Sequence, residues 1–205
     1  MIERPILFSG PMVRAIIEGY KTQTRRVVRP QPIGRLQHYG HGHWADSGAE
    51  YGANYVRCPY GVADDRLWIR ETFAIVPHTA YRHDPSIPHR VSPCGEFWAV
   101  YKEGWDRSAP RWKPSIHIPR WASRLTLVIE SVGIERVQAI DQADARAEGI
   151  ESCTVGRADL DHFPCKCVER FSSLWESIHG NGSWDLNPLV WVLRFHRLDT
   201  LGGDR

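Results

Sequence analysis

Amine, hydroxyl and guanidinium groups crowd residues 19–26, which read Gly-Tyr-Lys-Thr-Gln-Thr-Arg-Arg. Lys21 supplies an amine and Thr24 a hydroxyl three residues later, and Arg25 and Arg26 add two guanidiniums. Such groups can bind an anionic or carbonyl-bearing ligand, or move protons during amide hydrolysis, where they converge. The competing interpretation is a solvated basic turn, because clustered charges usually face water.

Amide hydrolysis needs a nucleophile, a base that takes its proton and an acid for the leaving amine. Thr24 can act as the nucleophile or position a water molecule. Lys21 can act as the base only where its pKa falls below the usual lysine value of about 10.4. Burial, or the neighbouring guanidiniums of Arg25 and Arg26, would lower it. A helical turn over this segment would bring Lys21 and Thr24 together, and Arg26 is suited to stabilise an oxyanion or hold the ligand.

A short amphipathic helix is expected just before this segment. Pro11 suits its first turn and Gly19 its end. Two further helices are expected, over 142–148 with Asp141 as N-cap and Gly149 as its end, and over 168–179. In the second, Phe171, Trp175 and Ile178 recur at helical spacing. Strands are expected over residues 5–8, 27–28, 66–73, 97–101, 125–132 and 189–195.

Two segments without periodicity, at about 33–60 and 77–111, are expected to be long loop insertions in a single domain that spans residues 1–205. The proline-flanked stretch 112–121 is expected to form a rigid extended wall. Five to six separated strands with a few short helices predict an α+β fold, as a small β-barrel. A doubly wound sheet is not expected, because no glycine-rich phosphate loop follows a strand.

The composition restricts the class of protein. The formal net charge of the 205 residues is only +2, so a nucleic-acid contact would be local and pocket-like. Arginine and the nine tryptophans are the residue types that stack on bases and bind phosphates, although most tryptophans are expected in the core. No apolar run is long enough to span a bilayer and no signal peptide is recognisable, which predicts a soluble, cytoplasmic protein without a membrane partner.

Five cysteines without a secretory signal favour reduced thiols. Cys153, His162, Cys165 and Cys167 lie close together in the sequence. Their spacing does not match the paired C-x(2–4)-C units of structural zinc sites. We therefore expect no metal and no other cofactor.

The motif in the first segment resembles the signature of the ASCH domain, a relative of the PUA RNA-binding fold. The pattern Gly-x-Lys-Thr-x-Thr-x-Arg is present as Gly19, Lys21, Thr22, Thr24 and Arg26. The resemblance implies a PUA-like barrel and a modified nucleoside or RNA as the partner.

Further segments agree with this resemblance in their order along the chain. The stretches 65–69 and 190–195 are similar to two strands of the family, and 58–61 and 112–124 resemble a longer ASCH-like subgroup that is common in phages and prophages. The family core accounts for about half of the chain, without the two insertions.

One branch of the family is similar in finer detail, namely the small bacterial amidohydrolases that deacetylate N4-acetylcytidine. Their active site is a lysine, a threonine and a glutamate, of which the first two match Lys21 and Thr24. The glutamate, from a helix late in the domain, matches Glu148, which would protonate the departing amine or steer the lysine. The structural alternative is that Lys21 and Glu148 form an ordinary ion pair, with Thr24 capping a backbone group.

Other side chains are candidates for substrate binding. Glu71 could accept hydrogen bonds from a cytosine amino edge, or be a surface strand residue. Candidates for stacking on a base are Trp68, Trp112 and Trp121. Ser115 and His117 belong to the proline-flanked wall and could line the same cleft.

Three functions follow from these observations. The first is hydrolysis of an N-acylated nucleoside or nucleotide such as N4-acetylcytidine. The second is non-catalytic binding of RNA or a modified base. The third is RNA cleavage, which some ASCH proteins perform.

Overall fold

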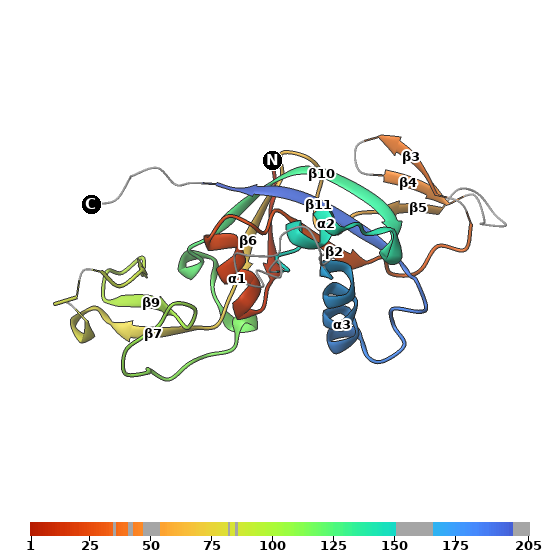
Figure 1. Cartoon of the computed structure of the whole chain (residues 1–205). Helices are drawn as coiled ribbons and strands as arrows, with labels where there is room; N and C mark the ends of the chain where they lie inside the picture. The colour runs from red at the N-terminus through yellow and green to blue at the C-terminus, as the bar shows by residue number, and fades with distance from the viewer. Residues whose placement is uncertain are drawn as a thin grey trace. The chain divides into compact units, whose positions relative to one another are not determined.

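The computed structural model describes residues 1–34, 36–40, 43–46, 54–81, 83–84, 86–150 and 166–198. Strands outnumber helices among these residues, and they belong to several sheets (Figure 1). The predicted α+β class is confirmed. The described strands form no closed barrel.

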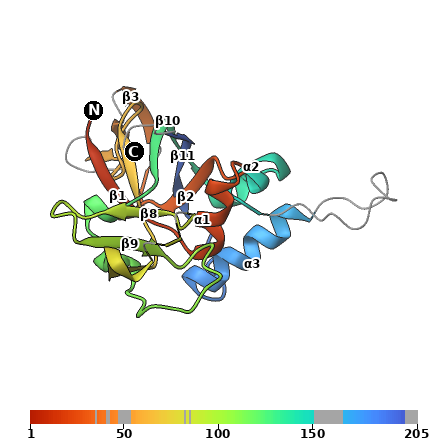
Figure 2. The ribbon, with the colours of Figure 1, turned by 90° about the vertical axis from the view of Figure 1, so that its left-hand side faces the viewer.

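The chain divides into two compact units, of which the first comprises residues 1–18, 64–128 and 196–205. Its elements are β1 (Glu3–Leu7), α1 (Gly10–Ile17), β6 (Arg66–Arg70), β7 (Phe73–Pro77), η1 (His78–Ala80), β8 (His89–Val91), β9 (Phe97–Tyr101), η2 (Ser115–His117), η3 (Arg120–Ala122) and the start of β10 (Thr126–Arg136). β6 pairs in parallel with β1 and antiparallel with the start of β10. A second sheet has the order β7-β9-β8, and Figure 2 shows β8 and β9 side by side.

The second unit comprises residues 19–63 and 129–195. Its elements are β2 (Gln23–Val27), β3 (Leu36–Gly40), β4 (His43–Asp46), β5 (Asn54–Arg57), the rest of β10, η4 (Val137–Ala139), α2 (Gln142–Ala147), α3 (Cys167–His179) and most of β11 (Leu189–Arg197). The strands β10, β11 and β2 follow one another in a sheet, and β3, β4 and β5 form a separate antiparallel sheet.

The helices begin and end where the local sequence predicts. α1 starts at Gly10 with Pro11 in its first turn, and Gly19, at a φ of 86°, follows its end. The Asp141 side chain caps α2, and Gly149, at a φ of 90°, follows it. Positive φ values suit glycine because it has no Cβ.

One face of α3 packs in the core of the second unit. Phe171 and Trp175 are buried there together with Val190 and Val192 of β11. Ile178, which the helical spacing placed on the same face, is instead 65% exposed. It lies in the last turn of α3, next to His179 and Gly180, where that face reaches solvent.

The basic segment itself forms β2, whereas the sequence predicted a turn or a helix there. β2 pairs antiparallel with β11, with Thr24 opposite Leu193 and Arg26 opposite Trp191. The sequence of this strand is polar because Arg25 is buried and paired with carboxylates from elsewhere in the chain. The expected helical approach of Lys21 to Thr24 is therefore wrong.

The two predicted insertions contain regular structure. Residues 33–60 include β3, β4 and β5, and residues 77–111 include β8 in addition to the predicted β9. In β3 no residue is fully buried, so its sequence lacks the apolar alternation that indicates a strand. The 112–121 stretch is not extended throughout, because Pro114 and Pro119 each precede a short 3₁₀ helix.

No helix in the described part of the chain has both the length and the apolar character that a membrane span requires.

We predict that Asp141→Ala lowers the free energy of unfolding by about 1 kcal/mol. The Asp141 Oδ1 accepts a hydrogen bond of 2.7 Å from the backbone N–H of Asp144 in the first turn of α2, and alanine cannot replace it. Urea unfolding followed by circular dichroism measures the change. Asp185→Ala, at an exposed aspartate, is the control and should stay within about 0.5 kcal/mol. Equal stability of both variants would contradict the capping role.

Candidate active site

Lys21 is a buried ammonium with three acceptors. Its side chain is 2% exposed. Nζ donates to the backbone oxygens of Gln23 at 2.7 Å and Glu148 at 2.6 Å, and to the Glu148 Oε2 at 3.2 Å. The structure therefore brings two of the three predicted catalytic residues into direct contact.

The end of α2 places Glu148 beside Lys21. Glu148 is the C-cap residue of α2, and the backbone N–H of Thr22 donates to the oxygen of Ala147 at 2.9 Å. The last carbonyls of a helix lack partners within the helix and carry its negative end. The Lys21 ammonium and the Thr22 N–H satisfy two of them, so the residues before β2 and the end of α2 hold each other in place.

Arg25 joins three carboxylates in the same cluster. Its guanidinium has no exposed side-chain surface. Its Nη1 donates to Glu148 Oε1 at 3.2 Å, its Nη2 to Asp144 Oδ2 at 2.6 Å, and its Nε to Glu135 Oε1 at 2.9 Å. One Glu148 oxygen thus contacts Lys21 and the other contacts Arg25, which fixes the carboxylate between two cations. We name Lys21, Arg25, Glu135, Asp144 and Glu148 the charge cluster.

The pKa values of Lys21 and Arg25, the two cations of the charge cluster, shift in opposite directions. Burial lowers the pKa of Lys21, because the ammonium loses its hydration, and the Glu148 carboxylate opposes this only in part. Burial also acts to lower the pKa of Arg25, but Glu148, Glu135 and Asp144 outweigh it and raise the value. Of the two cations, Lys21 is therefore the one that can give up a proton.

Thr24 and Arg26 lie on the other face of β2. Side chains alternate along a strand, so Gln23 and Arg25 share one face while Thr24 and Arg26 share the opposite one. Thr24 is buried. Its hydroxyl has no hydrogen bond to Lys21 or Glu148 in the part of the chain that the structure describes. Burial lowers the pKa of Arg26, whereas Tyr60 and Glu148 act to raise it.

The remaining candidates belong to the first unit. Glu71 follows β6 and is 2% exposed, and its two oxygens accept from Nε and Nη2 of Arg124 at 2.9 and 2.8 Å. Burial raises the pKa of Glu71, and Arg124 opposes this. Glu71 therefore forms a buried ion pair with Arg124 inside this unit and is not a surface residue of the strand.

The three tryptophan candidates differ in their surroundings. The guanidinium carbons of Arg70 and Arg120 lie 5.1 and 5.9 Å from the centre of the Trp68 ring. Trp112 meets Trp105 edge to face at 5.6 Å. Trp121 is partly buried against the cluster that contains Trp68.

Ser115 and His117 form the two ends of η2, a single 3₁₀ turn. His117 is exposed and Ser115 half-buried.

The sequence did not identify three residues that surround Lys21 in the site, namely Gln23, Glu135 and Asp144. The alternation of side chains along a strand would have grouped Gln23 with Arg25, but only after the segment was recognised as a strand. The carboxylates are 110 and 119 residues from Arg25 in sequence, so no local pattern connects them.

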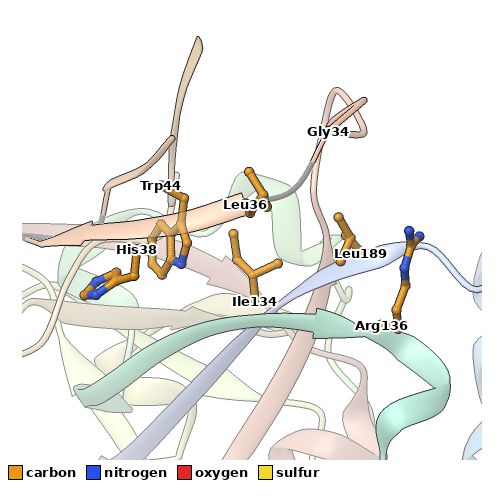
Figure 3. Close-up of a pocket in the computed structure, with 7 residues that line it drawn as sticks. All are labelled: Gly34, Leu36, His38, Trp44, Ile134, Arg136 and Leu189. Carbon is orange, nitrogen blue, oxygen red and sulfur yellow. The ribbon is translucent and has the colours of Figure 1, made fainter. Parts of the chain in front are cut away.

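A separate pocket of about 390 Å³ lies in the second unit and contains none of the predicted residues. Figure 3 shows its lining, with Ile134 of β10 rising beside the Trp44 ring and Arg136 at the end away from His38. The other lining residues are Gly34, Leu36 and Leu189. A second hollow of about 340 Å³ shares His38 and Trp44 with it.

Within the described residues no group of three or more acidic, histidine or cysteine side chains could hold a metal ion. Cys58 and Cys94 form no disulfide, whereas Cys167 takes part in one, which the expectation of reduced thiols did not include. Cys153, His162 and Cys165 lie outside the described residues.

Comparison of the chain with protein-family models, curated proteins and solved structures gave no match.

We predict that Arg25→Met lowers the free energy of unfolding by about 3–5 kcal/mol, because three carboxylates lose a shared buried cation. Chemical denaturation measures the loss. Arg194→Met is the matched control, since this side chain is 61% exposed and should contribute less than about 1 kcal/mol. Similar losses in the two variants would contradict the importance of the charge cluster for stability.

Proposed function

We propose that this chain is a hydrolase that removes the acyl group from the exocyclic amine of a modified nucleoside or nucleotide such as N4-acetylcytidine, in a PUA-like domain of the ASCH type. The observation that carries the proposal is the buried Lys21, whose pKa is lowered and whose Nζ lies 3.2 Å from the Glu148 carboxylate. Buried groups with shifted pKa values beside a charge partner are typical of catalytic sites. The choice of substrate rests on the resemblance of the 19–26 motif.

Lys21 in its neutral form would accept a proton from the attacking water. The water oxygen forms a bond to the acyl carbon while the C–N bond breaks. The proton then passes from the Lys21 ammonium to the departing amine, so the products are a carboxylic acid and the nucleoside with its free amino group. Lysine returns to its starting state after each turnover.

Glu148 would steer Lys21 rather than donate the proton itself. Its two carboxylate oxygens accept hydrogen bonds from Lys21 and Arg25, so both oxygens are engaged and the carboxylate holds the amine in one orientation. Of the two roles that the resemblance implies for Glu148, protonating the departing amine or steering the lysine, the proposal therefore keeps the second.

Water is the nucleophile in this proposal, because the Thr24 hydroxyl has no hydrogen bond to Lys21 among the described residues and lies on the face of β2 opposite Arg25. Thr24 and Arg26 share that opposite face, so the proposal gives neither of them a contact with the acyl carbonyl.

A second candidate function is non-catalytic binding of RNA or a modified base. The observation that favours it is that Lys21 already donates to three acceptors, as a purely structural lysine would.

We predict that Lys21→Met lowers kcat/KM for N4-acetylcytidine by about 10²–10⁴, the usual contribution of a general base. Glu148→Gln should cause a smaller loss, because the amide can still accept a hydrogen bond from Lys21. Chromatography of released cytidine measures both. Lys166→Met, at a lysine with a 64% exposed side chain, is the control and should retain full activity. Thermal unfolding of each variant verifies that it is folded. An inactive wild-type chain that binds the nucleoside or RNA would favour the binding module instead.

The proposal also predicts the pH dependence of the wild-type chain. Only the neutral amine of Lys21 accepts a proton, so kcat/KM should rise with pH through the pKa of this group. Because burial lowers that pKa, the midpoint of the rise should lie below the usual lysine value of about 10.4. The native state also binds fewer protons at Lys21 than the unfolded state does, so this contribution to stability increases with pH up to the usual value. A rate profile that is flat across this range would contradict the role of Lys21 as base.

A further inference from the structure

Gln23 contacts the charge cluster without belonging to its ion pairs. It is the first residue of β2, and its backbone oxygen accepts the 2.7 Å hydrogen bond from Lys21 Nζ. Its side chain lies on the same face of β2 as Arg25. It is only 2% exposed, so solvent does not hydrate its amide.

The orientation of the Gln23 amide follows from its partner. Arg194 Nε lies 3.1 Å from one terminal atom of Gln23. A guanidinium can only donate hydrogen bonds, so that atom is the oxygen Oε1 and the other is the nitrogen Nε2. Nε2 is buried and has no acceptor among the described residues.

The neighbouring donors are already engaged. Lys21 Nζ has three acceptors, and the Arg25 guanidinium has Glu135, Asp144 and Glu148. A ligand carbonyl that arrives at this face therefore has the Gln23 amide as its open hydrogen-bond donor. Arg194, whose side chain is 61% exposed, is the residue that donates to the oxygen of this amide.

A buried donor without an acceptor destabilises the folded protein, and such groups are rare in native structures. A catalytic or ligand-binding role is one reason for which a protein retains such a group. We propose that Gln23 Nε2 donates a hydrogen bond to the acyl carbonyl oxygen of the substrate and makes the site specific for an N-acyl group. This inference rests on the proposed hydrolase function and adds a specificity-determining residue to it.

The role has a defined chemical consequence. When water attacks, the carbonyl oxygen gains negative charge, and a donor that is already aimed at it stabilises this charge. A ligand without an oxygen opposite Nε2 leaves the Gln23 amide unpaired, so it gains nothing from this donor and binds less well than a ligand that has the acyl oxygen. Free cytidine, which lacks the acyl group, should therefore bind independently of Gln23.

The test compares two substitutions of Gln23. Gln23→Met removes the unpaired donor at similar volume, so Tm should rise by about 2–4 °C while kcat/KM for N4-acetylcytidine falls by about 10²–10³. Gln23→Glu retains an acceptor for Arg194 but has no donor, and it should lose activity to a similar extent. Binding of cytidine by Gln23→Met should be unchanged.

Gln31→Met is the matched control in the same unit. The Gln31 Nε2 donates to the oxygens of Val28 and Leu189 at 2.7 and 3.0 Å, and its Oε1 accepts from the Leu189 N–H at 2.8 Å. Because this amide is satisfied, its loss should lower Tm and leave kcat/KM unchanged.

Two results would overturn the inference about Gln23 alone. One is an active wild-type chain whose Gln23→Met variant has full kcat/KM, and the other is a fall in Tm of Gln23→Met as large as that of Gln31→Met. If the wild-type chain does not hydrolyse N4-acetylcytidine, the proposed function is wrong, and so is the proposal that Gln23 binds the acyl carbonyl of this substrate.

Discussion

The neutralisation of the buried Arg25 is the constraint on which the second unit depends. An unpaired guanidinium without exposed side-chain surface would be strongly destabilising, so its three carboxylates have to reach it. They come from β10, the first turn of α2 and the end of α2. Their convergence on β2 therefore positions α2 against the sheet.

The same constraint prepares Lys21 for chemistry. Glu148 divides its two oxygens between Arg25 and Lys21, so the carboxylate is only a partial counter-ion for the ammonium. Burial then dominates and lowers the pKa of Lys21. The ion pairs that stabilise the fold thus leave one cation able to exchange a proton. A lysine with an undivided carboxylate partner would stay charged.

Local sequence predicts the elements of this fold whose signals are local. The capping and glycine signals located α1 and α2, and apolar residues located α3, β6, β9 and β11. β2 was missed because its buried residues are polar or charged, and the carboxylates that neutralise Arg25 are more than 100 residues away in sequence. β3 to β5 were missed because few of their side chains are buried, so no apolar pattern marks them.

The candidate site could be predicted only in part for the same reason. The motif directed attention to Lys21, and the resemblance supplied Glu148 at a distance of 127 residues, where the structure places its carboxylate beside the amine. The contributions of Glu135, Asp144 and Gln23 depend on strand pairing and on the docking of α2, which a local pattern does not encode. Thr24 is the opposite case, in which a local pattern misleads. It is three residues from Lys21, a spacing that brings side chains together in a helix but places them on opposite faces along a strand.

The most direct test of this account is a titration of Lys21 itself. Lysine side chains labelled with ¹³C at Cε report the protonation of each amine in NMR spectra, and Lys21→Met identifies the signal. We expect the Lys21 signal to titrate below the usual lysine value of about 10.4. A Lys21 that titrates at that value, or at higher pH, would contradict its lowered pKa and its role as the base.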